Sequence, residues 1–127
     1  MNPIITNPGL VSRYDEFALA SKLTVDGASI SADGVLLRGT VLVKQSSNGK
    51  WHAFVHGTDT LAADQVRILK DELKVSAAAD AYGVGYFEGF FMLSDLLDAN
   101  SAGGLLLADL TTAAGFHQIE SNEVRLK

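Results

Sequence analysis

The fold is decided by "AYGVGYFEGFF", residues 81–91, in which three glycines fall within seven residues. A dinucleotide-binding turn needs the pattern G-x-G-x-x-G between a strand and a helix, so that the helix N-terminus faces the phosphates. Here the spacing is G-x-G-x-x-x-G, and aromatic residues, which favour strands, stand where the helix should begin. The stretch therefore predicts a strand and not a nucleotide site.

The two faces of this predicted strand differ in side-chain bulk. With a period of two, Gly83, Gly85 and Gly89 share one face with Ala81, Phe87 and Phe91. The other face carries Tyr82, Val84, Tyr86, Glu88, Phe90 and Met92. The first face is mostly bare backbone, so it predicts a close approach by another element.

Upstream, Asn48-Gly49 predicts the turn of a β-hairpin, because both residues tolerate the positive φ angles of a type I′ turn. Residues 39–46 and 50–57 should then pair antiparallel, with Leu42 opposite Val55 and Val43 opposite Phe54. Both faces of this hairpin carry apolar side chains. We expect one face to lie on the core and the other on a neighbouring subunit or element.

The remaining segments complete the expected fold. Short alternating runs predict strands after residue 21, and Val66 to Leu69 is favoured as another strand. A short helix capped by Ser94 and a longer one ending at Gly115 should follow, with a turn and a final strand to close the chain. The sequence thus predicts an α+β fold: a small β-rich domain of hairpins or a partly open barrel, with one or two short helices near the C-terminus.

Composition limits the classes of function. The chain has 127 residues, a net charge of −5, a pI near 5.0 and no cysteine. Its ten basic residues are scattered, which argues against nucleic acid as a partner. No apolar run approaches the ~20 residues that span a bilayer, so we expect no membrane partner. A single soluble domain is predicted.

No residue pattern predicts catalysis or a metal site. His52 and His56 would share a strand face, but their Cα atoms would lie about 13 Å apart at ~3.3 Å per residue, too far to share one ion. Residues 48–50 lack the upstream glycine of a P-loop, and residues 26–34 lack the second oxygen ligand of a calcium loop. We expect no enzyme activity, no cofactor and no metal.

Both prolines, Pro3 and Pro8, fall in the first eight residues, which predicts an extended, poorly packed N-terminal segment. A frayed terminus is one explanation. The β-branched pair Ile4-Ile5, with Tyr14 soon after, favours another: a segment that buries these groups on a partner. We therefore divide the chain into an extended arm, residues 1–20, and a compact domain, residues 21–127.

Taken in their order along the chain, four segments resemble the head decoration (capsid-stabilising) proteins of tailed bacteriophages. "LLRGTVLVKQSSNGKW" is similar to a family hairpin, and "ADQVRILKDEL" stands where the family has a hydrophobic segment. "EGFFMLSDLL" resembles a strand end leading into a helix, and "LLADLTTAAGFHQI" resembles the closing helix and last strand. The resemblance runs from about Gly34 to Lys127, and the N-terminal segment is outside it.

The resemblance implies a structural virion protein, made in the host bacterial cytoplasm and bound to the outer capsid surface. It implies a homotrimer at three-fold and quasi-three-fold sites of the expanded capsid, attached to the major capsid protein through the arm. The arm residues assigned to capsid binding are Asn2, Pro3, Ile4, Ile5, Thr6 and Tyr14. The aromatic residues Trp51, Phe54, Tyr86 and Phe90 are candidates for the subunit interface. The alternative is a non-catalytic small-molecule or glycan-binding β-module, in which Trp51 and the aromatic strand would stack on a ligand.

Overall fold

The computed structural model describes residues 18–56, 58–62, 65–99, 110 and 114–126. Of the described residues, 53% lie in strands and 8% in helical turns, and none lies in a helix of seven residues or more. The predicted α+β class is therefore wrong for this part of the chain, which is all-β and built around a closed barrel of five strands.

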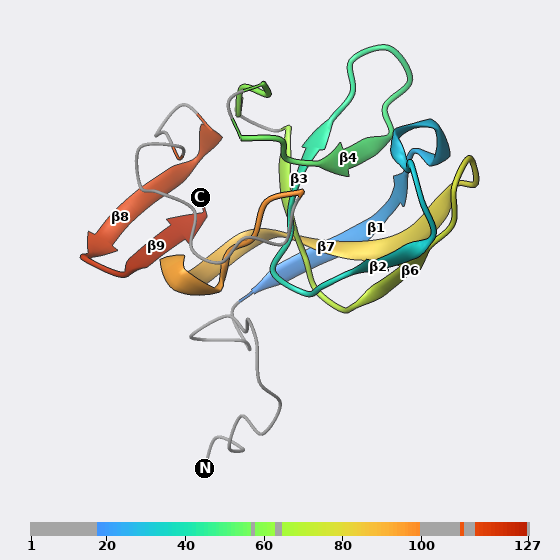
Figure 1. Ribbon diagram of the computed structural model, residues 1–127. Helices are drawn as coiled ribbons and strands as arrows, with labels where there is room; N and C mark the ends of the chain where they lie inside the picture. The colour runs from blue at the N-terminus through green and yellow to red at the C-terminus, as the bar shows by residue number, and fades with distance from the viewer. Residues whose placement is uncertain (1–17, 57, 63–64, 100–109, 111–113, 127) are drawn as a thin grey trace.

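The chain forms nine strands and two short 3₁₀ turns in the described part (Figure 1). In order they are β1 (Leu19–Val25), η2 (Gly27–Ser29), β2 (Gly34–Leu36), β3 (Val41–Lys44), β4 (Trp51–Ala53), β5 (Val66–Leu69), β6 (Leu73–Val75), β7 (Ala81–Met92), η3 (Leu93–Asp95), β8 (Phe116–Glu120) and β9 (Glu123–Leu126). β1 starts at residue 19, so the expected boundary between arm and domain at residue 20 falls inside a barrel strand.

The barrel follows the strand order β1-β4-β3-β5-β7 and closes because β7 also pairs with β1. The β1–β7 pairing is antiparallel and runs the length of β1, from Leu19 opposite Glu88 to Val25 opposite Ala81. By contrast, β1 and β4 are parallel and joined by a single residue pair, Val25 with Trp51. The β1–β4 seam is thus the weakest closure of the barrel. The β8–β9 hairpin extends the sheet from β7, and β2 pairs with β6 as a separate ribbon.

The long strand predicted from the glycine-rich stretch is confirmed as β7. A Cβ atom added to Gly85 would lie 2.7 Å from Leu23 Cδ2 and 3.0 Å from Arg67 Cβ, so the predicted close approach is present. The predicted strict alternation of β7 side chains between two faces, in contrast, is not observed. The register with β1 shifts between Leu19 and Ala20, and Gly85 and Tyr86 are both buried. A bulge of this kind re-aims the side chains that follow it.

The hairpin of β3 and β4 forms as predicted, but in a different register. Leu42 pairs with Ala53 and Val43 with His52, two residues away from the predicted partners. The cause is a longer turn: Gln45 and Lys50 are bonded through their backbones, and Gly49 has a φ of 72°. Asn48 is not among the described residues with positive φ, so the turn is not type I′.

Two apolar clusters fill the molecule, and alternation along β3 separates them. All five barrel strands contribute to the first, the barrel interior, which contains Leu23, Val25, Leu42, Trp51, Leu69 and Ala81. The second lies on the outer side of β3 and β5, where Val41, Val43, Val66 and Ile68 meet residues of β7, β8 and β9. Of the two faces expected for the hairpin, the one outside the barrel interior is therefore covered by other elements of the same chain.

The two helices predicted near the C-terminus have different outcomes. Residues 94–99 contain no α-helix; η3 is a three-residue 3₁₀ turn, and its N-cap is Met92, not Ser94. The longer predicted helix, residues 103–115, lies almost wholly outside the described residues, although Gly115 has the expected positive φ of 90°. The final strand is confirmed as β9. Within the part of the chain that the structure describes, no helix is long and apolar enough to cross a membrane.

Candidate functional site

The structure places most of the predicted interface residues in the interior. Trp51, Phe54 and Tyr86 are 6%, 3% and 3% exposed and belong to the two core clusters. Their side chains offer no surface to another subunit, so assigning them to an interface was wrong. Phe90 is half-buried. The arm residues Asn2, Pro3, Ile4, Ile5, Thr6 and Tyr14 lie outside the described residues.

The two histidines do not share a strand face, because β4 ends at Ala53 and His56 lies beyond it. The His52 ring lies between two side chains instead: Nδ1 is 3.1 Å from Gln45 Oε1, and Nε2 is 2.9 Å from Asp59 Oδ2. The described residues contain no cluster of three His, Cys, Asp or Glu side chains that could hold a metal ion.

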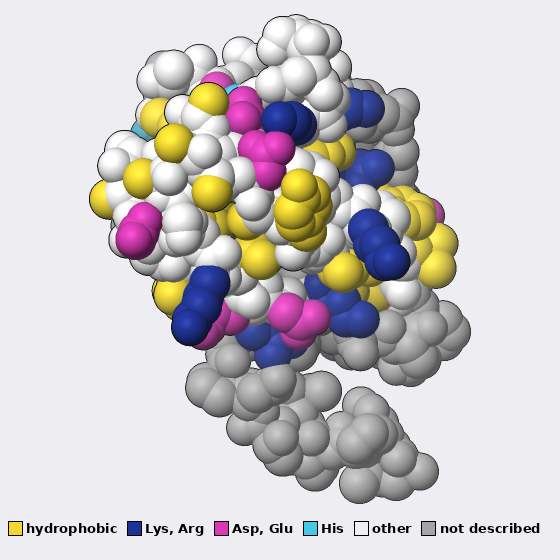
Figure 2. All heavy atoms as spheres, turned by 90° about the vertical axis from the view of Figure 1, so that its right-hand side faces the viewer, with side chains coloured by type: hydrophobic (Ala, Val, Ile, Leu, Met, Phe, Trp, Pro, Cys, Tyr) yellow, Lys and Arg dark blue, Asp and Glu magenta, His cyan; other side chains and the backbone are white. Residues whose placement is uncertain are grey.

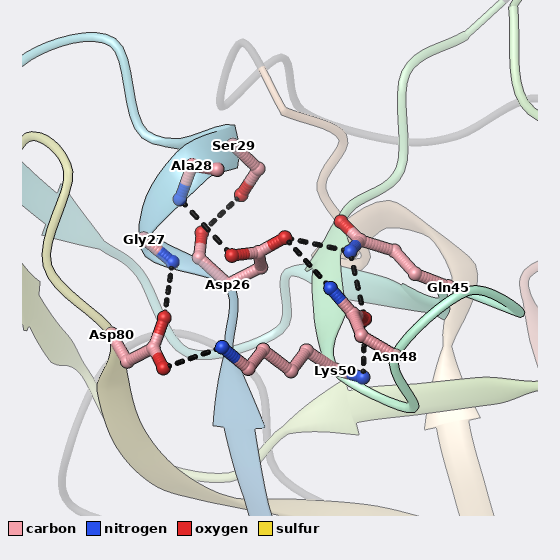
Figure 3. Close-up of polar contacts among 8 residues, drawn as sticks. All are labelled: Asp26, Gly27, Ala28, Ser29, Gln45, Asn48, Lys50 and Asp80. Carbon is pink, nitrogen blue, oxygen red and sulfur yellow. Dashed lines mark hydrogen bonds and ion pairs between the residues drawn. The ribbon is translucent and has the colours of Figure 1, made fainter.

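A polar network ties three loops together at one end of the barrel (Figure 3). Its centre is Asp26, which directly follows β1 and is 9% exposed. One carboxylate oxygen accepts a bond from the backbone N–H of Ala28 at 3.0 Å. The other accepts bonds from the side-chain amides of Gln45 at 2.7 Å and Asn48 at 3.3 Å. Asp26 thus links η2 to the β3–β4 turn.

Asp80 makes the third link, from the turn before β7. It accepts a bond from the Gly27 backbone N–H at 2.7 Å and pairs with Lys50 Nζ at 2.8 Å. The hydrogen bond that Lys50 donates to Asp80 holds the pKa of Asp80 below its ordinary value and raises the pKa of Lys50. The Gln45 amide, followed by the Ala28 N–H, lowers the pKa of Asp26. All four carboxylate oxygens are occupied, so the network acts as a structural clamp.

We expect Asp26→Asn to unfold at a lower temperature than the wild type at neutral pH. An asparagine Nδ2 would present hydrogens to the donors of Gln45 and Asn48 and would remove the charge that they stabilise. A lowered pKa means that the stabilisation by Asp26 is present above its ordinary value of 3.8 and is lost as pH falls through the lowered pKa. The difference in melting temperature should therefore shrink below about pH 4.

Circular dichroism melts between about pH 3 and pH 7 test this expectation. Asp71→Asn is the matched control, because Asp71 is exposed and no bond is recorded for its side chain. The control should follow the wild-type curve at every pH. A difference between Asp26→Asn and wild type that stays constant across this range would contradict the assignment to the Asp26 carboxylate.

One concave feature of the described surface is a groove where β1 and β4 diverge beyond the pair Val25–Trp51. It has a volume of about 390 Å³ and lies between β4, β2 and the end of β6. Its apolar lining includes Val25, Ile30, Val35, Ala53, Val55 and Val75. Val35 and Val55 are 42% and 37% exposed, among the most exposed large apolar residues of the described chain. No Asp, Glu, Lys or Arg lines the groove. The lining thus combines apolar residues with Ser29, Ser31 and His52.

A second, shallower hollow lies on the β1–β7 ribbon. Tyr82, which is 74% exposed, stands beside Gly83 and Val84, with Lys22 and Thr24 across from them. Of the aromatic residues proposed to stack on a ligand, Trp51 is buried and Tyr82 is exposed. On the end of the molecule shown in Figure 2, hydrophobic side chains are scattered among acidic and basic ones, with no single basic patch.

The groove was not predicted as a site, although one signal for it was visible. The hairpin sequence predicted apolar side chains on both faces, and Val55 belongs to the groove lining. The partners of Val55 come from β2, β6 and η2, which short-range patterns could not bring together. A scan of the chain against protein-family models, a search of curated proteins and a search of solved structures each found no match.

Proposed function

We propose that the protein is a capsid decoration protein, which binds the outside of an expanded phage capsid as a trimer and stabilises the shell. The observation that carries the proposal is the contrast between the barrel, whose interior is filled, and the N-terminal arm. The barrel interior is packed with apolar side chains, and the carboxylates at its loop end are already bonded within the chain. Residues 1–12, in contrast, contain no Asp, Glu, Lys or Arg and include both prolines.

An uncharged arm of this kind suits attachment to the edge of a β-sheet in a partner protein. An extended segment can add a strand to an exposed edge, where backbone bonds give affinity and alternate side chains fill pockets. Ile4 and Ile5 are the β-branched pair of this segment, and the major capsid protein would supply the edge. Three arms from one trimer would bind together, so weak single contacts would become strong through effective concentration. Bridged capsomers would then resist the pressure of packaged DNA without any catalytic step.

Deleting residues 1–13 should abolish attachment to expanded capsids while the domain stays folded. The deletion ends before β1, which begins at Leu19, so the pairings of the barrel are retained. Cosedimentation of the truncated protein with purified expanded and immature shells measures attachment, and thermal unfolding checks the fold.

Two full-length variants sharpen the result. Ile4→Asp/Ile5→Asp should behave as the deletion does, because it puts charge where apolar contacts are proposed. Ile119→Asp changes an apolar residue that is 47% exposed on β8, far along the chain from the arm, and should attach normally. Normal attachment by the truncated protein would refute the role of the arm.

A further inference from the structure

We propose that the groove where β1 and β4 diverge (the β1–β4 groove) binds a small, uncharged molecule that contains one apolar amino-acid residue between two amide groups. The C=O and N–H of that residue pair with the backbone N–H and C=O of Ala53, and its side chain lies against the apolar part of the lining. This inference goes beyond the proposed function, because it uses the described barrel alone and holds whether or not the protein binds a capsid.

An open pair of backbone groups lies at Ala53, in the lining of the groove. Phe54, the next residue, donates its backbone N–H to the C=O of Val41 on β3 at 2.8 Å. Because backbone groups point alternately to the two sides of a strand, Ala53 directs its N–H and C=O away from β3 and toward the side of β1. β1 does not reach them, since its pairing with β4 is confined to Val25 and Trp51. No described residue bonds to either group.

Such a pair of groups recognises one residue of a ligand. Two opposite residues of an antiparallel sheet exchange both of their N–H···O=C bonds, because each carries a donor and an acceptor on the same side. A longer strand finds no second pair here, because Val55, the next residue on this side, is already bonded. Its C=O accepts the N–H groups of Thr58 and Asp59, and its N–H donates to the Asp59 carboxylate. The edge therefore selects a molecule with a single residue-like unit.

The side chains of the groove determine the rest of the ligand. Apolar residues of β1, β2, β6 and the loop after η2 form one part of the lining: Val25, Ile30, Val35, Leu36 and Val75. No Asp, Glu, Lys or Arg is among the described lining residues. A charged ligand would lose hydration without gaining an opposite charge, so an uncharged ligand with an apolar side chain is favoured.

The polar side chains of the lining leave the Ala53 backbone as the principal recognition group. His52 has both ring nitrogens engaged by side-chain oxygens of the same chain, at 3.1 Å and 2.9 Å. The Ser29 hydroxyl donates at 2.6 Å to the backbone C=O that follows β1. Of the polar lining side chains, that of Ser31 alone has no bond to a described residue, and Ser31 is exposed. The ligand is therefore held in place by Ala53 and gains at most one further side-chain hydroxyl contact.

The groove also has room for such a molecule. Its volume of about 390 Å³ falls in the range of ~300–1,000 Å³ typical of small-molecule sites. Val35 and Val55 are 42% and 37% exposed, so an apolar ligand side chain placed on them removes apolar surface from water on both partners. Donor, acceptor and apolar wall together thus fit one small molecule.

Amide NMR of the isotope-labelled, full-length protein tests the inference with two probes. N-acetyl-L-leucine methylamide carries the proposed unit. Its N-methylated form, N-acetyl-N-methyl-L-leucine methylamide, lacks the N–H that would bond to the Ala53 C=O. We expect the first probe to shift the Ala53 amide signal saturably and the second to bind about tenfold more weakly, because a backbone group would then be covered without a partner.

A pair of variants locates the site. Val35→Trp fills the groove with its own side chain and should abolish the Ala53 shift, whereas Ile119→Trp should bind the first probe as the wild type does. The two positions match in exposure, at 42% and 47%, and Ile119 lies outside the groove lining. On the wild-type protein alone, the absence of a saturable Ala53 shift, or equal affinity for the two probes, would overturn the inference. Unchanged binding by Val35→Trp would place the probe elsewhere and overturn it too.

Discussion

Replacing Gly27 with alanine is expected to lower the free energy of unfolding by about 3 kcal/mol or more, a large part of the stability of a typical domain. A Cβ atom at this position would lie 2.4 Å from the carbonyl carbon of Ala79 and 2.6 Å from the backbone nitrogens of Ala79 and Asp80. These are backbone atoms, which cannot rotate away as the end of a side chain can.

The clash also falls on the clamp at the loop end of the barrel. Gly27 donates its backbone N–H to Asp80 Oδ1 at 2.7 Å, and this bond holds the β6–β7 turn against η2. Pushing the turn outward to make room for a methyl group would lengthen that bond and strain the Lys50–Asp80 pair. The alanine variant should therefore lose packing and polar contacts together.

Gly34→Ala is the matched control for this prediction. A Cβ atom at Gly34 would meet no heavy atom within 4 Å, and no positive φ is recorded there. Removing a glycine at such a site reduces the entropy of the unfolded chain and stabilises by ~0.4–1 kcal/mol. Urea unfolding of both variants gives the comparison. If Gly27→Ala unfolds at the same urea concentration as wild type, the close approach of the two loops is not present in solution.

The strand elements could be predicted from sequence because their signals are local. β5 was placed at its observed bounds from a short run of β-branched and aliphatic residues, and β7 from its aromatic and glycine content. The bare face of β7 follows from the barrel. Five strands leave little room inside: a Cβ atom at Gly85 would lie 2.7 Å from Leu23 Cδ2, and one at Gly83 would lie 3.2 Å from Leu73 Cδ2.

Features that depend on more than one segment were not predictable in this way. The observed hairpin register differs from the predicted one by two residues. Asp26, which lies 22 positions before Asn48, accepts hydrogen bonds from the side chains of Asn48 and Gln45, and these bonds favour a longer turn. Burial of Trp51 depends on barrel closure, and burial of Tyr86 depends on the outer cluster that β8 and β9 complete; no periodic pattern encodes either. The groove likewise joins β2, β4 and β6, so its apolar residues appear in the sequence as unrelated short strands.

Phe91→Ala is expected to have the second large effect, lowering the free energy of unfolding by about 3–5 kcal/mol. Phe91 is fully buried, at 0% exposure, and is the largest of the fully buried side chains. It lies in the outer cluster, where its ring centroid is 5.4 Å from that of Tyr86, and its backbone pairs with Val124 of β9. Truncation would leave a cavity between β7 and the β8–β9 hairpin, and a cavity adds to the lost transfer free energy because the surrounding backbone relaxes only in part.

Tyr82→Ala provides the control on the same strand. It removes an aromatic ring of similar size, but one that is 74% exposed, so the change should stay within about 0.5 kcal/mol. Both variants lose the β propensity of an aromatic residue, and the difference between them isolates burial. Urea unfolding measures the two values. Similar losses for both variants would mean that Phe91 is not enclosed by β9, and that the β8–β9 hairpin does not pack on the barrel as one body with it.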